Sequence, residues 1–353
     1  EYRRQRQMCI RDSPSGETPS GVSLMAKKEN PKRIFYPQQT YRLPFIRLPE
    51  DPPEPPDSVA KVSLSEKNQS ESSPALLDAR HLLINYDEIA LKGGNRRYFE
   101  NRLQKNIRAA LKDLGGSHLK PRFGRFLLRL GQETSLERVC SRLARIPGIA
   151  LFSPCISTSA DLDSVKKAMD TVLEPLLETG KQPDHFAIVS RRANKELPFT
   201  STEANEIIGK YVQEKTGWKV RLKTPQLPLY LFFVNNDCFL ALDRFPGLGG
   251  LPTGTTGRVA CLLSGGIDSP VSSARIIRRG AEALFIHFHS HPHTSIASQD
   301  KVRDLAARII PPGRSARLYM VPFADTQNRI ITELSLIHIS EPTRRTPISY
   351  AVF

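Results

Sequence analysis

The sequence predicts three globular units in series: two units of the α+β type, followed by an α/β unit built on a doubly wound parallel sheet. Short apolar runs alternate with apolar stripes of helical spacing from Arg80 onward. After Val259 the strand and helix patterns alternate one for one, which predicts parallel strands joined by right-handed crossovers. A Gly-rich stretch, Gly247–Gly257, marks the boundary before this last unit.

The first unit begins with a short apolar strand at His81–Tyr86. The next helix is predicted to start at an Asn95 N-cap and to stop at Gly115-Gly116; its apolar stripe consists of Phe99, Leu103, Ile107, Leu111 and Leu114. A strand at Arg122–Leu130 and a helix at Ser135–Ile146 follow. The expected result is a small β-α-β-α unit.

The second unit opens with a helix whose apolar stripe consists of Val165, Ala168, Met169, Val172, Leu173 and Leu176. A strand is predicted at His185–Ser190, followed by a cluster of basic residues. Ser201 is the expected cap of a helix that runs to Glu214, with an apolar face of Ala204, Ile207, Tyr211 and Val212. Two apolar runs flank Asn235-Asn236, which predicts a β-hairpin.

The third unit starts with VACLLS, which has the composition of a buried strand. The elements expected after it are a helix at Pro270–Gly280, a strand at Glu282–Phe288, a helix carrying Val302, Leu305, Ala306 and Ile309, a strand at Arg317–Phe323 and the start of a helix at Asp325–Ile331. The pattern ends near Leu334. This is short for such a domain, so we expect it to be incomplete.

Composition favours a protein that binds polyanions. The chain has 353 residues, with 51 Lys+Arg against 36 Asp+Glu, a net charge of +15. No apolar run reaches the ~18 residues of a membrane span, and no secretory signal opens the chain, so cytoplasm is the expected location. The five cysteines form no C-x-x-C pair, which argues against a disulfide scaffold or a Cys-based metal site.

Both ends of the chain are expected to lie outside the fold. Glu1–Ser13 and Ser335–Phe353 resemble translated sequencing adapters, and we do not expect them to contribute to the fold. The natural start would then be Met25, and the natural C-terminus would be missing. Residues 14–79 are rich in Pro and Ser, as in Pro49–Ser58, and are predicted to be disordered.

The stretch with the clearest chemical meaning is LLSGGIDSP, Leu262–Pro270, between a predicted strand and a predicted helix. Glycines let backbone N–H groups approach an anion, and the helix N-terminus adds free donors. Ser264 and Ser269 can add hydroxyl donors to phosphate oxygens, and Asp268 can help to hold Mg²⁺. The stretch is not a Walker A loop, because G-x-x-x-x-G-K-[ST] is absent.

A second polar cluster, HFHSHPH, places four histidines at the end of the second strand of this unit: His287, His289, His291 and His293. No cysteine or carboxylate joins them locally, so no metal site is predicted. The preferred interpretation is a strand end beside the bound nucleotide, with His287 and Phe288 near the adenosine.

These segments resemble one known family. SGGIDS matches the signature of PP-loop ATP pyrophosphatases, and Asn85–Leu103 and Gly250–Val271 resemble tRNA 4-thiouridine synthetases, also called tRNA sulfurtransferases. The resemblance implies a layout of an N-terminal ferredoxin-like domain (80–146), a THUMP RNA-binding domain (147–246), a Gly-rich linker (247–257) and an incomplete PP-loop domain (258–334).

The resemblance also implies a reaction. ATP activates O4 of the tRNA uridine at position 8 by adenylation, and sulfur from a persulfide donor, a protein of the cysteine desulfurase type, displaces AMP to give 4-thiouridine. Asp268 and Ser264 are the expected catalytic residues. Leu262 and Leu263 would present backbone to the ATP, and the phosphates and Mg²⁺ would be held by Ser264, Gly265, Gly266, Asp268 and Ser269.

Further expectations concern partners. Arg191, Arg192 and Lys195 are the candidate RNA contacts, with a solvated charged face as the alternative. The family's sulfur-handling cysteine falls beyond the matched region, and Cys261, inside a strand, does not inherit that role. A link to thiamine thiazole synthesis and a homodimer both stay open.

Two other functions compete with this interpretation. One is a non-catalytic THUMP protein that only binds tRNA, which the intact loop argues against. The other is a different PP-loop tRNA-modifying enzyme, which the two units before the loop argue against.

Overall fold

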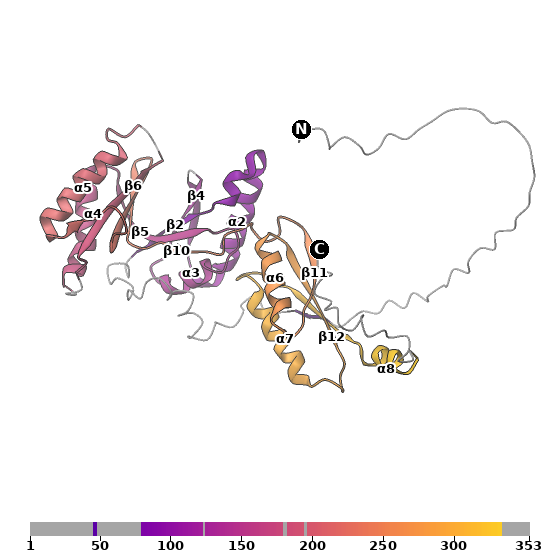
Figure 1. Cartoon of the computed structure of the whole chain (residues 1–353). Coiled ribbons are helices and arrows are strands. Elements are labelled where there is room, and N and C mark those ends of the chain that lie inside the picture. Colours follow the sequence, from indigo (N-terminus) through magenta and orange to yellow (C-terminus); the bar gives the residue numbers. More distant parts are fainter. Residues whose placement is uncertain (1–44, 48–78, 123, 179–181, 194–195, 334–353) are drawn as a thin grey trace, which may run out of the picture. The chain divides into compact units, whose positions relative to one another are not determined.

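The computed structural model describes residues 45–47 and 79–333, except 123, 179–181 and 194–195. Its strands form two sheets. The larger has nine strands in the order β3-β4-β2-β5-β9-β8-β6-β7, with β10 added to β5, and the smaller has the order β1-β13-β12-β11 (Figure 1). The predicted mixture of α+β and α/β units is confirmed.

The first unit has the ferredoxin-like order β-α-β-β-α-β. Its elements are β2 (His81–Asn85), the 3-10 helix η2 (Glu88–Asn95), α2 (Arg96–Ala110), the 3-10 turn η3 (Lys112–Leu114), β3 (His118–Arg122), β4 (Arg125–Arg129), α3 (Leu136–Leu143) and β5 (Leu151–Ser159). The single strand predicted over Arg122–Leu130 is wrong. The chain turns there at Gly124, whose φ of +76° suits glycine, and β3 and β4 form a hairpin.

The caps of the two helices of this unit differ from each other. Asn95 is the N-cap residue of α2, as predicted, but its side chain makes no capping hydrogen bond, since its own backbone is helical and continues from η2. Ser135 caps α3, and its Oγ accepts a hydrogen bond from the N–H of Arg138 at 3.4 Å.

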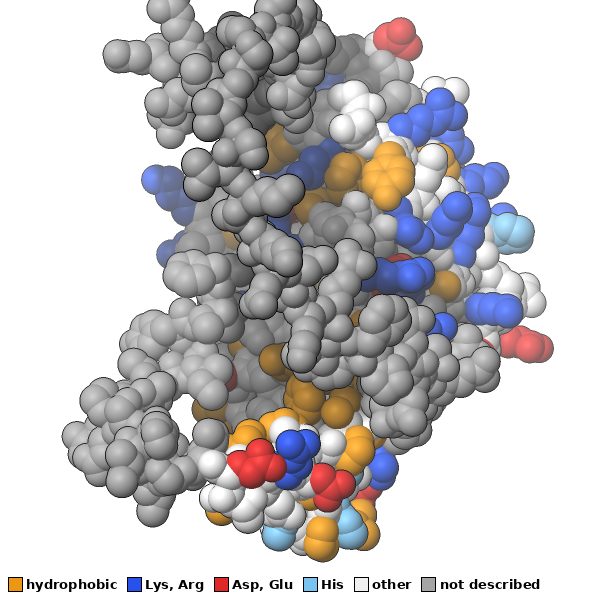
Figure 2. All heavy atoms as spheres, turned by 90° about the vertical axis from the view of Figure 1, so that its right-hand side faces the viewer, with side chains coloured by type: hydrophobic (Ala, Val, Ile, Leu, Met, Phe, Trp, Pro, Cys, Tyr) orange, Lys and Arg blue, Asp and Glu red, His pale blue; other side chains and the backbone are white. Residues whose placement is uncertain are grey.

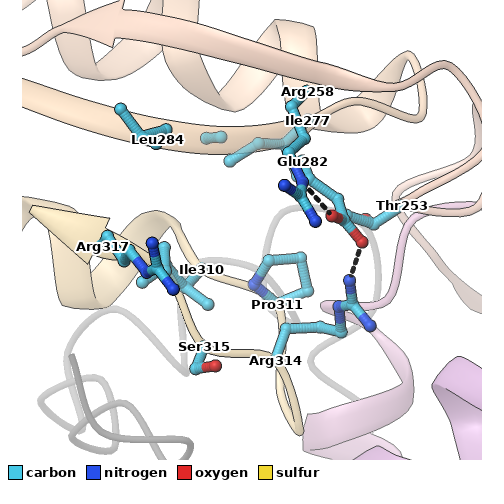
Figure 3. Close-up of a pocket in the computed structure, with 12 residues that line it drawn as sticks. Thr253, Arg258, Ile277, Glu282, Leu284, Ile310, Pro311, Arg314, Ser315 and Arg317 are labelled. Carbon is cyan, nitrogen blue, oxygen red and sulfur yellow. Dashed lines mark hydrogen bonds and ion pairs between the residues drawn. The ribbon is translucent and has the colours of Figure 1, made fainter. Parts of the chain in front are cut away.

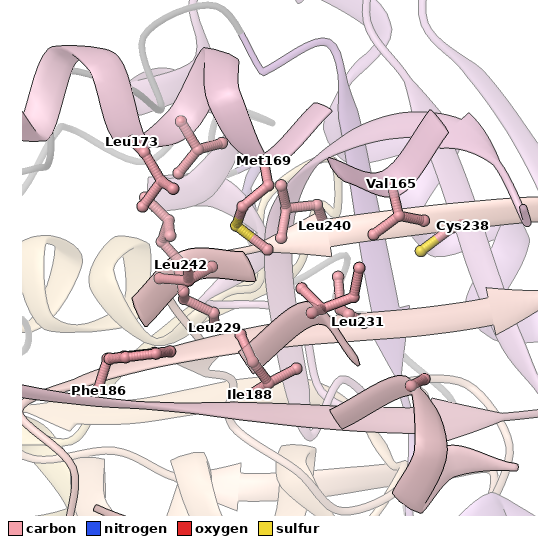
Figure 4. Close-up of a cluster of buried hydrophobic side chains, with 14 of the residues drawn as sticks. Val165, Met169, Leu173, Phe186, Ile188, Leu229, Leu231, Cys238, Leu240 and Leu242 are labelled. Atoms are coloured by element: carbon pink, nitrogen blue, oxygen red, sulfur yellow. The ribbon is translucent and has the colours of Figure 1, made fainter. Parts of the chain in front are cut away.

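The second unit contains α4 (Leu162–Glu178), β6 (His185–Arg192), α5 (Ser201–Thr216), β7 (Lys219–Val220), β8 (Leu227–Val234) and β9 (Asp237–Ala241). The predicted stripe of α4 is confirmed, because all six of its residues are buried. Five of them, all but Ala168, belong to one core cluster with residues of β6, β8 and β9, as Figure 4 shows for Val165, Met169 and Leu173. The predicted Asn235-Asn236 hairpin joins β8 to β9.

Two details of α5 differ from the prediction. The cap is Thr200 rather than Ser201, and it forms a capping box with Glu203. The buried face also differs in part: Ala204 and Val212 are buried as predicted, but Ile208 is fully buried whereas Ile207 is 40% exposed.

Strand β5 joins the first two units, since its residues Leu151–Cys155 pair with β2 and its residues Ile156–Ser159 pair with β9, both antiparallel. The short strand β10 (Phe245–Pro246) returns to pair with the first part of β5, where Phe245 stacks on Phe152. The nine strands are therefore one continuous sheet.

The third unit contains β11 (Arg258–Leu262), α6 (Asp268–Arg278), β12 (Glu282–His289), α7 (Ile296–Ile309), β13 (Arg317–Pro322) and α8 (Ala324–Glu333). The predicted parallel pairing of its strands is confirmed. One core cluster contains residues of α6, α7 and all three parallel strands, so both helices cover the same face of the sheet.

Two predictions for this part of the chain are wrong. Strand β11 is not buried, because it pairs only with β12 and its far face is uncovered within the described residues; Leu262 is 65% exposed. Residues 45–47, in the segment predicted to be disordered, form β1 (Phe45–Arg47), antiparallel to β13. The rest of residues 1–78 lies outside the described residues.

The Gly-rich connector is packed against the turn that follows α6 in the third unit. The N–H groups of Gly254, Thr255 and Thr256 all donate to the carbonyl of Gly280, at 2.7, 2.9 and 3.2 Å. A Cβ on Gly280, where φ is +96°, would meet Thr255 Oγ1 at 2.4 Å, so this turn requires glycine. These contacts fix the end of α6, the helix that begins at the candidate site.

Candidate functional site

The SGGIDS loop lies at the carboxyl end of β11 and leads into α6, the position at which ligands bind in parallel α/β sheets. Two serine hydroxyls close it. The N–H of Ser264 donates to Ser269 Oγ at 2.9 Å, and the two hydroxyl oxygens lie 3.0 Å apart. The loop is thus shaped by its own side chains.

The loop leaves several donors facing solvent. Gly265 and Ile267 have backbone N–H groups without a partner among the described residues, and the first N–H groups of any helix lack one within the helix. Gly266, Ile267 and Asp268 are exposed. Asp268, the first residue of α6, has no ion pair in the described part of the chain, so its carboxylate is available to a cation.

The two leucines before the loop lie differently. Leu263 is 2% exposed, its N–H donates to the carbonyl of Ile286, and its own carbonyl accepts a hydrogen bond from His287 Nδ1, both at 2.8 Å. Leu263 therefore holds the loop against β12. Leu262 ends β11, opposite Ile286, with its side chain on the uncovered face of the sheet.

Successive side chains of β12 point to opposite faces of the sheet, so His287 and Phe288 lie in different surroundings. His287 is 8% exposed, and its Nε2 has no partner among the described residues. Phe288 points to the other face, where it is half-exposed and meets the edge of Phe323 with ring centroids 5.8 Å apart. Burial, and then the nearby His287, His291 and Arg303, lower the pKa of His289. Within the described residues no group of three His, Cys, Asp or Glu could hold a metal ion.

The candidate RNA contacts differ in exposure and in hydrogen bonding. Arg191 is exposed at the end of β6. Arg192 is turned inward, where its guanidinium donates to the carbonyl oxygens of Phe199 and, at 3.5 Å, of Leu197. Its observed contacts thus hold the segment before α5. Lys195 lies outside the described residues.

The structure adds two arginines to Arg191. Arg125, from β4, lies over Phe232 at 5.5 Å, and Arg244 lies over the ring of Tyr230 at 5.2 Å. Burial, and then the charges of Arg191 and Arg244, lower the pKa of Arg125. The three arginines come from distant parts of the sequence, and no local spacing signals them. Only the i, i+2 placement of Tyr230 and Phe232 on β8 hints at this cationic and aromatic surface.

A pocket of about 240 Å³ lies at the amino-terminal ends of the parallel strands of the small sheet, the ends opposite to the loop (Figure 3). Glu282 lies between Arg314, with which it forms an ion pair, and Arg258, at 3.6 Å. The carboxylate is thus already neutralised by arginines. The pocket is separate from the loop, which follows the other ends of these strands.

The pKa of each described cysteine thiol is raised. Burial, with a smaller effect of Glu137, raises the pKa of Cys140 to about 12. Burial likewise raises the pKa values of Cys155, Cys238 and Cys261. Cys9 lies outside the described residues. None of these four side chains is suited to carry a persulfide, since the thiolate is the reactive form.

In Figure 2, Lys and Arg side chains gather in the upper right of the view, with few acidic side chains among them. This agrees with the net charge of +15 and with an affinity for polyanions. None of the helices that the structure describes is long and apolar enough to cross a membrane.

The fold and the loop define the class: a PP-loop nucleotide-binding α/β domain preceded by an α+β extension with a cationic surface. Three family models match in this order: the ThiI ferredoxin-like domain over residues 81–153, the THUMP domain over 159–243 and "Thiamine biosynthesis protein (ThiI)" over 254–342. The last match extends into the segment expected to be adapter-derived. The chain belongs to the ThiI family of tRNA sulfurtransferases.

Similar proteins support this assignment. The "Probable tRNA sulfurtransferase" of Thermus thermophilus is 39% identical over 248 residues, 70% of this chain and 60% of that protein. The protein of the same name from Bacillus velezensis is 35% identical over 272 residues, 77% of this chain and 67% of its own length. A crystal structure of a 4-thiouridine synthetase–RNA complex with bound ATP matches with TM-score 0.64 and 31% identity, covering 73% of this chain and 66% of that one.

The chain spans about 60% of the length of the first curated relatives that it matches. Activity, substrates and partners are therefore proposed for the whole protein to which this chain belongs.

Proposed function

We propose that this protein is an ATP-dependent tRNA sulfurtransferase of the cytoplasm that converts the uridine at position 8 of tRNA to 4-thiouridine. The observation that carries the proposal is the SGGIDS loop itself. It is closed by Ser264 and Ser269, exposes unpaired N–H groups and stands at the carboxyl end of a parallel strand. This arrangement suits the phosphates of ATP, the ligand named for the related synthetase complex.

The activation step follows from this geometry. The uridine O4 forms a bond to the α-phosphorus of ATP as the bond to the β-phosphate breaks, and the electron pair leaves with pyrophosphate. The loop N–H groups and the start of α6 stabilise the negative charge that gathers on the leaving group. Ser264 and Ser269 keep the loop in shape before the substrate arrives.

Asp268 fits a Mg²⁺ ion in this site. Its carboxylate is exposed beside the loop without an ion pair in the described structure, and Mg²⁺ is usually bound by one or two carboxylates together with substrate phosphates. When bound, the ion would supply charge neutralisation to the pyrophosphate. His287 and Phe288 would border the nucleoside end, and of the two only Phe288 exposes its ring.

The tRNA would use the cationic surface of the first two units. Arg191, Arg125 and Arg244 offer charge to phosphates, and Tyr230 and Phe232 lie beneath two of these guanidinium groups. The sulfur would come from elsewhere, because three of the described cysteines are buried, the fourth is partly buried, and the pKa of each thiol is raised. A persulfide-bearing protein partner of the cysteine desulfurase type meets this need, and the family name leaves a further role in thiamine synthesis open.

The experiment measures 4-thiouridine on unmodified tRNA, by the absorbance of the thiolated base, with ATP and a persulfide donor. It uses the complete open reading frame that encodes this chain. Asp268→Ala should lower the rate by about 10²-fold or more, the loss typical of a group that stabilises charge in the transition state. The matched control is Asp304→Ala, an exposed aspartate of α7 without an ion pair in the described structure, which should keep the wild-type rate.

If the wild-type protein binds tRNA but forms no 4-thiouridine with a competent sulfur donor, the proposed sulfurtransferase activity is refuted. That result would leave a tRNA-binding protein in its place. An equal loss of thiolation rate in Asp268→Ala and Asp304→Ala would show that Asp268 has no specific role in the reaction.

A further inference from the structure

The loop that would hold the phosphates contains no basic residue. Between Arg258 and Arg275 the sequence has neither Lys nor Arg. A Walker A loop carries its own lysine for this purpose, and phosphoryl transfer needs positive charge where the leaving group develops negative charge. A basic side chain that acts beside the Mg²⁺ ion proposed at Asp268 must therefore come from another element of the fold.

Lys301, on α7, is the basic side chain that the structure places against the loop. Its stem lies beside Gly265, because a Cβ built on that glycine would touch Lys301 Cδ at 3.6 Å. The ammonium group is only two bonds beyond Cδ. Gly265 thus leaves the space along which the lysine stem passes from α7 to the loop.

The charge of Lys301 is not engaged elsewhere. Its side chain is exposed, and it has no ion pair or hydrogen bond within the described part of the chain. The neighbouring Asp300 is already paired with Arg303. An exposed ammonium beside unpaired N–H groups of a glycine loop has the arrangement that attracts a phosphate.

We propose that Lys301 binds the pyrophosphate part of ATP and neutralises the charge on it when the bond to the α-phosphate breaks. This inference rests on the proposed nucleotide site. The nucleoside end would lie along the end of β12, so the more highly charged end lies over the loop, beside Gly265 and Lys301. In this role the lysine acts as a fixed positive charge.

The test measures the affinity of the chain for ATP, inorganic pyrophosphate and AMP by titration calorimetry in the presence of Mg²⁺. Lys301→Met keeps most of the stem and removes the charge. It should weaken ATP and pyrophosphate binding about tenfold or more, the usual effect of losing a charged hydrogen bond, and change AMP binding by less than about twofold. Lys301→Arg should restore most of the loss for ATP.

The matched control is Arg308→Met, which removes one charge from an exposed position two turns further along α7. Equal ATP and pyrophosphate affinities in Lys301→Met and Arg308→Met would overturn the inference. Equal losses for ATP and AMP would also overturn it, since the contact would then be to the α-phosphate. A wild-type chain that binds none of the three ligands would refute the nucleotide site itself, a result distinct from the first two.

Discussion

At the scale of single residues, the sequence identified the loop but not all that surrounds it. Ser264, Asp268 and Ser269 could be named because they sit in one short motif at a strand–helix junction. Lys301, Arg125 and Arg244 could not, because folding brings them from other elements to the loop and to the rings of Phe232 and Tyr230. Arg192 shows the reverse case, since a basic residue after a strand looked free in the sequence but binds backbone carbonyls in the structure.

The buried thiols give a prediction about pH. An ordinary thiol has a pKa near 8.5, so about a quarter of it is thiolate at pH 8, whereas burial raises the pKa of Cys140 to about 12. In a Cys9→Ser variant, we expect an alkylating reagent to label the native chain at pH 8 at least about 100-fold more slowly than the unfolded chain. Mass spectrometry of the labelled peptides checks this.

The sign of the linked stability is set by the same shifts. The folded chain keeps these protons longer than the unfolded chain, so the stabilisation is complete below the ordinary thiol pKa and falls as the pH rises above it. Rapid labelling of native Cys140 or Cys261 at pH 8 would contradict their raised thiol pKa values and reopen both as candidate sulfur carriers.

At the scale of elements, helices with a clear apolar stripe were predicted best, because a period near 3.6 residues is visible in any window of that length. Strands were harder. The β3–β4 hairpin looked like one apolar strand, and β5 was missed because it alternates between two different cores. The exposure of β11 depends on its place at the edge of the sheet, which no local pattern contains.

The start of α5 allows a paired test. Thr200 Oγ1 accepts from the N–H of Glu203 at 3.2 Å, and the N–H of Thr200 donates to the Glu203 carboxylate at 2.7 Å. Thr200→Ala should lower the free energy of unfolding by about 1 kcal/mol. Ser201→Ala, one residue on, should change it by less than about 0.5 kcal/mol.

The measurement is urea unfolding followed by the fluorescence of Trp218, the only tryptophan of the chain, which is buried in the same core as α5. A larger loss of unfolding free energy for Ser201→Ala than for Thr200→Ala would show that Ser201 is the cap, as predicted from the sequence.

At the scale of the whole molecule, the order of the three units could be predicted, but their separation at residue 147 does not match how the sheet is built. The core of the first unit includes Ile149 and Phe152, beyond that boundary, and β5 is one of the two strands that pair with β2. Domain boundaries inferred from composition fail where one strand serves two cores.

Fragments of the chain test this dependence. A fragment of residues 79–146 lacks β5 and two core residues, and we expect it to show no cooperative unfolding transition by circular dichroism. A fragment of residues 79–246 retains all nine strands of the larger sheet and should unfold cooperatively. A cooperative transition of similar midpoint in both fragments would show that the first unit is complete without β5.

The shared strand also bears on how such proteins can evolve. Gene recombination spreads domains most easily when the breakpoint falls between units that fold alone. A breakpoint near residue 147 would give one descendant an unfinished sheet and the other a strand with half of its partners missing. The ferredoxin-like and THUMP units should therefore be inherited together, while either end of the pair can be joined to new catalytic partners.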